Sequence, residues 1–159
     1  IDALARASAR PQRVVGLHFF NPPPLIPLIE VVPAAATDQE VVDAVCAFAE
    51  SLGKTPITVP NRPGFIVNRL LFAMIAEALR IVDEGGTSAQ DVDRALCLGA
   101  SHPIGPLALA DFIGLDVALD ILESLASGLG AHYAPSSALR ERVSQGHLGR
   151  KTGRGFFSY

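Results

Sequence analysis

The pattern of hydrophobic and polar positions changes near residue 60. Before it, three short runs rich in Val, Ile and Phe predict strands at residues 13–20, 28–32 and 55–59. Between the second and third runs, apolar residues recur at helical spacing over residues 41–52 and predict a helix. Residues 60–64 are rich in proline and glycine, and we place the boundary between two domains there.

Local signals mark the ends of the predicted helices. Thr37 and Glu40 have capping-box spacing, and Gly53 suits the position that follows the last turn of the first helix. Beyond residue 64 every predicted element is a helix. These helices cover residues 64–84, Ser88 to Gly99, Pro106 onwards with a break at Gly114, and Ser136 or Ser137 to Gly146.

Composition and charge exclude several classes of protein. Hydrophobic residues make up 49% of the 159 residues and charged residues 18%, so a sizeable core is available. The net charge is −3 and no run of Lys or Arg exists, which argues against a nucleic-acid or anionic membrane partner. No apolar stretch reaches the roughly 18 residues of a membrane span. Two cysteines without disulfide spacing favour a cytoplasmic location.

His18 is the first candidate for chemistry. It lies near the carboxyl end of the first predicted strand, and ligands of open α/β sheets bind beyond that end. The alternative is a hydrogen-bonded histidine of the core. Glu30 favours the chemical interpretation because it interrupts the apolar run Ile29 to Val31, where a carboxylate is costly unless it is paired.

A proline-rich turn separates the strands of His18 and Glu30 and can bring the two side chains together. A carboxylate that holds an imidazole is a recurrent general-base pair, because it selects the tautomer and stabilises the imidazolium. The alternative is a glutamate on an edge strand that faces solvent.

Asn68 is a third candidate, on the long helix. It lies in the apolar stripe with Phe72, Ile75 and Leu79, and in the first turn, where free N–H groups favour an oxygen-rich ligand. The alternative is an amide bonded to a neighbouring loop. The glycine-rich tail from residue 149 is either a solvated loop or a loop over an anionic cofactor. The histidines have no companions at ligand spacing, so no metal site is expected.

Five separated segments together resemble the 3-hydroxyacyl-CoA dehydrogenase family. They cover nearly the whole chain, in the family's order. They are Gly16-Leu17-His18-Phe19-Phe20-Asn21-Pro22, Leu28-Ile29-Glu30-Val31, Pro63-Gly64-Phe65-Ile66-Val67-Asn68-Arg69, His102-Pro103-Ile104-Gly105-Pro106-Leu107 and Lys151-Thr152-Gly153-Arg154-Gly155-Phe156. The fourth segment, with His102-Pro103, and the short tail are most similar to the bacterial 3-hydroxybutyryl-CoA type, which implies a short acyl chain.

The resemblance implies a role for each matching residue. His18 matches the catalytic histidine, which takes the proton of the substrate 3-hydroxyl while hydride leaves C3 for NAD. Glu30 matches the carboxylate partner of the histidine, and Asn68 an asparagine of the active site. Asn21 matches a supporting asparagine, and Lys151 a tail lysine that reaches the cofactor. The implied partners are an acyl-CoA substrate of fatty acid β-oxidation and a second subunit, in a homodimer formed through the helical domain.

The resemblance also implies the fold, which is mainly α. Residues 1–60 correspond to the last α/β segment of a Rossmann-like NAD-binding domain, and residues 61–159 to an all-α substrate and dimerisation domain. The chain starts abruptly at Ile1 and holds no GxGxxG fingerprint, so we expect a C-terminal portion. Strands 14–20 and 28–32 then have open edges, and we expect residues 1–60 to be displaced, swapped or supported by a symmetry mate instead of lying in an ordinary Rossmann layer.

Two alternative functions stay open. One is a non-catalytic dimerisation or acyl-CoA-binding module derived from such an enzyme. The other is a related dehydrogenase that acts on a sugar acid.

Overall fold

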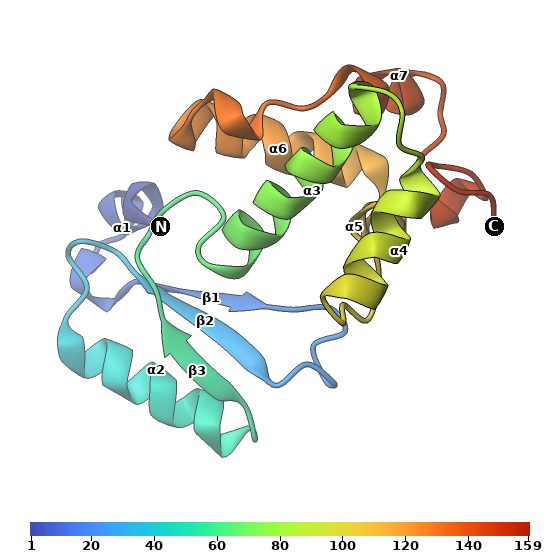
Figure 1. Cartoon of the computed structure of the whole chain (residues 1–159). Helices are drawn as coiled ribbons and strands as arrows, with labels where there is room; N and C mark the ends of the chain where they lie inside the picture. Colours follow the sequence, from blue (N-terminus) through green and yellow to red (C-terminus); the bar gives the residue numbers. More distant parts are fainter. The chain divides into compact units, whose positions relative to one another are not determined.

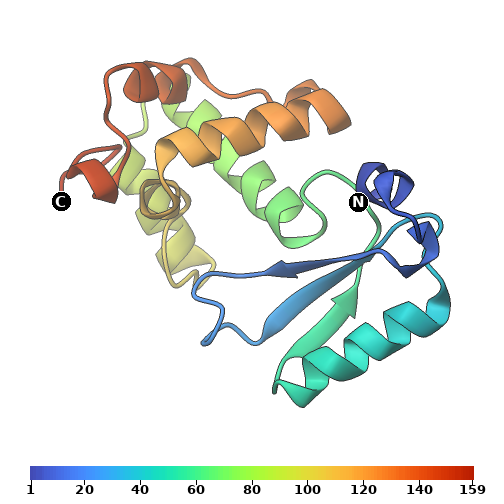
Figure 2. The same cartoon turned by 180° about the vertical axis from the view of Figure 1, so that it is seen from behind.

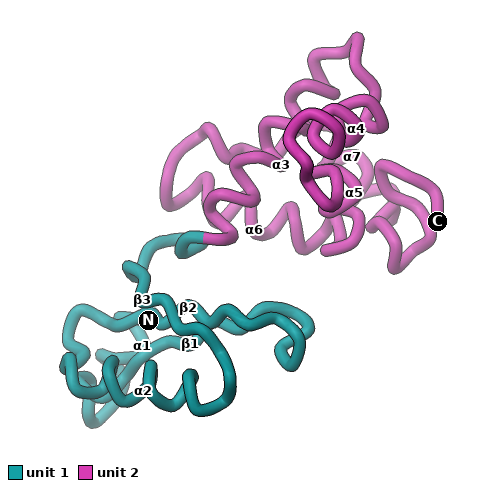
Figure 3. The backbone as a smooth tube through the Cα atoms, turned by 60° about the horizontal axis from the view of Figure 1, so that its bottom comes forward, with its two compact units in different colours: residues 1–66 teal, residues 67–159 magenta.

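The chain divides into two compact units. The computed structural model describes all residues from Ile1 to Tyr159, and unit 1 covers Ile1–Ile66 whereas unit 2 covers Val67–Tyr159 (Figure 3). The boundary lies a few residues beyond the expected one between residues 60 and 61. The turn after residue 60 stays attached to unit 1 because the Ile66 amide donates to Glu30 Oε1 at 2.9 Å.

Unit 1 is a small sheet with helices. Its elements are α1 (Asp2–Ala7), the 3₁₀ turn η1 (Pro11–Arg13), β1 (Val15–Phe19), β2 (Leu28–Pro33), α2 (Gln39–Ser51) and β3 (Thr55–Thr58). The sheet has the order β1-β2-β3, with β1 antiparallel and β3 parallel to the central strand (Figures 1 and 2). Ile29 and Val31 of β2 pack on Val42 and Ala49 of α2, and these four side chains form the buried core of the unit.

Two expectations about unit 1 are wrong. The helix α2 begins after Asp38, without a side-chain cap, so Thr37 is not its N-cap. The Thr37 hydroxyl donates to the Val14 carbonyl at 2.5 Å and accepts from the Ala34 amide, which binds it to the strands instead. The strands are also not displaced: β1, β2 and β3 pair in continuous register, although β1 and β3 are edges.

Unit 2 is built from helices. They are α3 (Val67–Asp83), α4 (Ala89–Gly99), α5 (Pro106–Ile113), α6 (Leu115–Leu129) and α7 (Ser137–Ser144), with 3₁₀ turns η2 (Ala131–Tyr133) and η3 (Arg150–Thr152). Ser88 and Ser136 cap α4 and α7 through their hydroxyls, and Pro106 opens α5, as the local signals predicted. The prediction of a mainly helical chain is confirmed. The description of residues 61–159 as all-α holds only in part, because isolated β-bridges pair Arg154 with Gly149 and with Ser158 in the tail.

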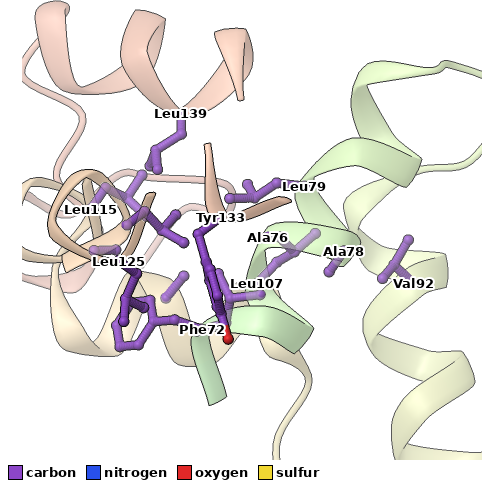
Figure 4. Close-up of a cluster of buried hydrophobic side chains, with 14 residues drawn as sticks. Phe72, Ala76, Ala78, Leu79, Val92, Leu107, Leu115, Leu125, Tyr133 and Leu139 are labelled. Carbon is purple, nitrogen blue, oxygen red and sulfur yellow. The ribbon is translucent and has the colours of Figure 1, made fainter. Parts of the chain in front are cut away.

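The core of unit 2 lies between α3, α5 and α6. Figure 4 shows Phe72, Leu107, Leu125 and Tyr133 among the buried side chains that meet there. The polar end of Tyr133 has a partner as well, because its hydroxyl donates to the Arg69 carbonyl at 3.1 Å. This interior makes α3 a rigid support for the residues of its first turn.

Candidate active site

His18 and Glu30 form a cross-strand pair. They are directly opposite in the antiparallel register of β1 and β2, and His18 Nδ1 lies 2.7 Å from Glu30 Oε2. The Glu30 side chain is 1% exposed, whereas that of His18 is 27% exposed. The predicted contact is therefore present. The alternative of a solvent-facing edge glutamate is wrong, because β2 is the central strand.

The second carboxylate oxygen of Glu30 is held by the turn that ends unit 1. Glu30 Oε1 accepts the Ile66 amide, and the turn before it has positive φ at Gly64 (73°) and at Phe65 (47°). A positive φ is uncommon for a phenylalanine and persists only where the surroundings impose it. Two hydrogen bonds supply that constraint. The Ile66 amide donates to Glu30, and the Phe65 amide donates to the Arg62 carbonyl.

Two aromatic rings flank the imidazole. The ring centroids of Phe20 and Phe65 lie 4.5 Å and 5.5 Å from that of His18. The sequence reasoning did not single out either ring. Two signals in the sequence could have indicated these rings. Phe20 shares a strand face with His18, and the glycine before Phe65 permits a sharp turn.

This arrangement can serve as a general base. A carboxylate only accepts, so Nδ1 carries the proton toward Glu30, and Nε2 keeps its lone pair for a substrate proton. The tautomer follows from this hydrogen bond. When Nε2 takes up a proton, the buried Glu30 carboxylate stabilises the imidazolium.

The other predicted residues lie outside this contact. Asn21 is exposed, at the start of the loop after β1. Asn68 is half-buried as the second residue of α3 in unit 2, as predicted for the first helical turn. The roles of Asn21 and Asn68 in a reaction therefore stay predictions.

Lys151 has a partner that the sequence did not reveal. Its ammonium lies 2.5 Å and 2.6 Å from the two oxygens of Asp116, in the first turn of α6. The same hydrogen bond is the main cause that lowers the pKa of the Asp116 carboxyl. The tail cation is thus paired within unit 2, and a contact of Lys151 with a cofactor requires it to leave or share Asp116.

The structure shows neither a metal-ligand cluster nor a membrane-spanning helix. No group of three or more His, Cys, Asp or Glu side chains is placed to hold a metal ion. None of the helices combines the length and the apolar character needed to cross a bilayer.

Comparison with known proteins assigns both parts of the chain to one family. Residues 1–62 match the model of the 3-hydroxyacyl-CoA dehydrogenase NAD-binding domain, and residues 64–159 match that of the C-terminal domain. A probable 3-hydroxybutyryl-CoA dehydrogenase of Bacillus subtilis is 49% identical over 100% of this chain and 56% of its own length. A 3-hydroxybutyryl-CoA dehydrogenase of Clostridioides difficile is 43% identical over 100% of this chain and 57% of its length.

A solved structure agrees with these relatives. The crystal structure of (S)-3-hydroxybutyryl-CoA dehydrogenase from Ralstonia eutropha superposes with a TM-score of 0.97 at 47% identity, over 100% of this chain and 56% of that one. The chain therefore spans about half the length of the relatives it matches. With both domain models matched in order, this chain belongs to the 3-hydroxyacyl-CoA dehydrogenase family.

Proposed function

We propose that the protein containing this chain is an NAD-dependent dehydrogenase that oxidises (S)-3-hydroxyacyl-CoA to 3-oxoacyl-CoA, or catalyses the reverse reaction. The observation that carries the proposal is the 2.7 Å contact between His18 Nδ1 and the buried Glu30. It leaves a partly exposed imidazole nitrogen with an oriented lone pair, as removal of a hydroxyl proton requires.

The residues of this chain handle the proton. In the oxidation, the substrate O–H bond breaks and its proton passes to His18 Nε2, while the electron pair of that bond forms C3=O and the C3 hydrogen leaves with the C3–H electron pair as hydride. NAD, when bound, supplies the acceptor for that hydride. Glu30 keeps the proton on Nδ1 and balances the new positive charge. In the reverse direction, the imidazolium returns the proton to the oxygen.

The fit to NAD is supported by the match of residues 1–62 to the NAD-binding domain model of the family. His18 is one residue from the carboxyl end of β1, which is an antiparallel edge strand, so its place on the strand does not itself define a cofactor site. No GxGxxG fingerprint lies within residues 1–159, so we assign the pyrophosphate to no residue of this chain. We retain Lys151 as a proposed cofactor contact, in which the cofactor competes with Asp116 for the ammonium.

The remaining assignments follow the family. We propose that Asn68 binds substrate and that Asn21 supports the site. A short acyl chain is supported by the relatives named 3-hydroxybutyryl-CoA dehydrogenase. We further propose a cytoplasmic location in fatty acid β-oxidation. A homodimer through unit 2 is supported by exposed apolar side chains on its helices, namely Leu70, Leu98 and Phe112.

A chain-length series of 3-oxoacyl-CoA substrates, given with NADH to the full-length protein, tests this function. We expect turnover that is highest for the four-carbon substrate. Binding of acyl-CoA without turnover would favour a non-catalytic module. Turnover only with sugar acids would favour the related dehydrogenase and overturn the proposal.

A further inference from the structure

The loop between β1 and β2 has a hydrogen-bonding problem. Four of the residues from Asn21 to Pro27 are prolines, which have carbonyl acceptors but no N–H donors. The loop therefore offers more acceptors than it can pair internally. Within it, the Leu25 and Ile26 amides both donate to the Pro22 carbonyl, at 3.0 Å and 3.1 Å. Other carbonyls of the loop are left to solvent or to donors from elsewhere in unit 1.

Lys54 supplies these donors. Its Nζ lies 2.6 Å from the Pro23 carbonyl, 3.1 Å from that of Pro24 and 2.9 Å from that of Ile26. An ammonium has three N–H donors, so three acceptors use its full capacity. Hydrogen bonds from a charged donor are about twice as strong as neutral ones. Lys54 forms no salt bridge, so its charge is balanced by these dipoles.

The backbone brings Lys54 to this place. Gly53 leaves α2 with a φ of 71°, which turns the chain so that Lys54 precedes the first residue of β3. The next residue, Thr55, donates its amide to the Pro27 carbonyl at 2.8 Å. One short segment thus holds the loop at four carbonyls, from Pro23 to Pro27.

The loop also joins the two halves of the catalytic pair. It starts three residues after His18 and ends three residues before Glu30, and it leaves β1 at the end where His18 is partly exposed. Its conformation therefore sets the surface next to the reactive imidazole. Leu25 of this loop has an apolar side chain that is 77% exposed, which an acyl chain can cover.

We propose that Lys54 is a positioning residue that holds the Asn21–Pro27 loop in the conformation that binds the acyl-CoA substrate, through its three hydrogen bonds to loop carbonyls. This inference rests on the proposed function for the identity of the substrate. Lys54 acts through the loop backbone and not on His18, because Glu30 alone holds Nδ1. Loss of the ammonium should therefore weaken substrate binding more than it slows the chemical step.

The test is Lys54→Met in the full-length protein. Methionine keeps an unbranched apolar stem and removes all three donors. We expect the KM for the 3-oxoacyl-CoA substrate to rise about tenfold, which corresponds to about 1.4 kcal/mol. The kcat should stay within about threefold, and the pH–rate profile should not move, since both follow from the His18–Glu30 pair. Arg10→Met is the matched control, because it removes an exposed cation of unit 1 whose side chain has no partner, and should leave KM unchanged.

Amide hydrogen exchange gives a readout that does not depend on activity. The Leu25, Ile26 and Thr55 amides should exchange at least tenfold faster in Lys54→Met, and the β1–β2 amides should not. If that variant does not fold, Lys54→Arg serves instead. Its planar fork cannot aim three donors at acceptors that converge on one point, so we expect the same changes to a smaller extent.

Unchanged exchange of these amides with unchanged KM would overturn the inference. So would a fall in kcat with a shifted pH–rate profile at constant KM, because Lys54 would then act on the histidine. If the wild-type protein turns over no 3-oxoacyl-CoA, the proposed function fails, while the exchange measurement still decides whether Lys54 holds the loop.

Discussion

At the scale of single residues, the site depends on one buried carboxylate. Glu30 lies in the central strand with 1% of its side chain exposed, where an unpaired charge is costly. Its oxygens reach the His18 ring and the Ile66 amide, so the charge is compensated by directed hydrogen bonds. The same bonds orient the imidazole, which links the burial of Glu30 to the reactivity of His18.

His18→Gln should reduce kcat of the full-length protein by ~10²–10⁴-fold, because the general base is lost. The KM for substrate should change far less, since glutamine fills a similar volume. Steady-state kinetics with a 3-oxoacyl-CoA and NADH measure both quantities. A kcat within about threefold of the wild-type value would remove His18 from the mechanism.

Glu30→Gln should also lower kcat, because a neutral amide does not stabilise the imidazolium. The pH dependence of kcat should move with it, since the ionisation of His18 then lacks its anionic neighbour. The matched control is Glu50→Gln on the exposed face of α2, which should leave kcat and the profile as they are. Equal profiles for both variants would show that Glu30 has no part in proton transfer.

Asp116→Asn tests the ion pair of the tail. The hydrogen bond from Lys151 lowers the pKa of the Asp116 carboxyl in the folded protein below its ordinary value, so the pair stabilises the fold above that ordinary pKa and loses its effect as the pH falls through the lowered pKa. Both side chains are about 40% exposed, so the contribution at neutral pH should be at most about 1 kcal/mol. Unfolding free energies of wild type and variant should differ at pH 7 and converge toward pH 3. A difference that grows on acidification would contradict this assignment.

At the scale of elements, two buried aspartates of unit 2 accept backbone amides from segments distant in the sequence. The N-cap of α5 is Gly105, which has no side chain, and Asp93 of α4 accepts the amides of Leu107 and Ala108 at 2.9 Å and 2.8 Å. Burial raises the pKa of Asp93 although these hydrogen bonds oppose it. In the same way Asp111 of α5 accepts the Phe156 and Phe157 amides and fixes the C-terminal tail.

Asp93→Ala should destabilise unit 2 by about 2 kcal/mol, the upper end for a lost helix cap, because two amides at the start of α5 lose their acceptor. Ser88→Ala removes the ordinary cap of α4, which is exposed, and should cost about 1 kcal/mol. Denaturant unfolding of both variants gives the comparison. The assignment of Asp93 as a cap fails if its loss costs less than that of Ser88.

At the scale of the whole molecule, two units with separate cores carry the two halves of the proposed chemistry. Unit 1 holds the proton-transfer pair, and unit 2 holds Asn68 and the exposed apolar surface. The family models divide the chain between residues 62 and 64, close to the division of the structure after Ile66. The two compact units therefore correspond closely to the two family domains.

The full-length protein should be a dimer in sedimentation experiments at tens of micromolar, because unit 2 leaves large apolar side chains exposed. Leu98→Lys, at a position that is 77% exposed on α4, should shift the protein toward monomer. Leu4→Lys, at a position that is 67% exposed on α1 of unit 1, is the control and should not. A wild-type monomer at this concentration would rule out dimerisation through unit 2.

The sequence by itself determined the elements whose signals are local. Ser88, Ser136 and Pro106 start helices where their own backbone geometry requires, and Gly114 interrupts a helix with a φ of 107°. Alternation and the cost of a buried charge also identified His18 and Glu30, because a carboxylate within an apolar strand needs a partner nearby.

Only the tertiary structure decided which distant residues meet. Thr37 has the spacing of a helix cap, yet the Val14 carbonyl takes its hydroxyl. Lys54 meets prolines about thirty positions earlier, and Lys151 meets Asp116. Hydrogen bonds of this kind depend on where the packing of the whole chain leaves a donor beside an unpaired acceptor, and no local spacing encodes that position.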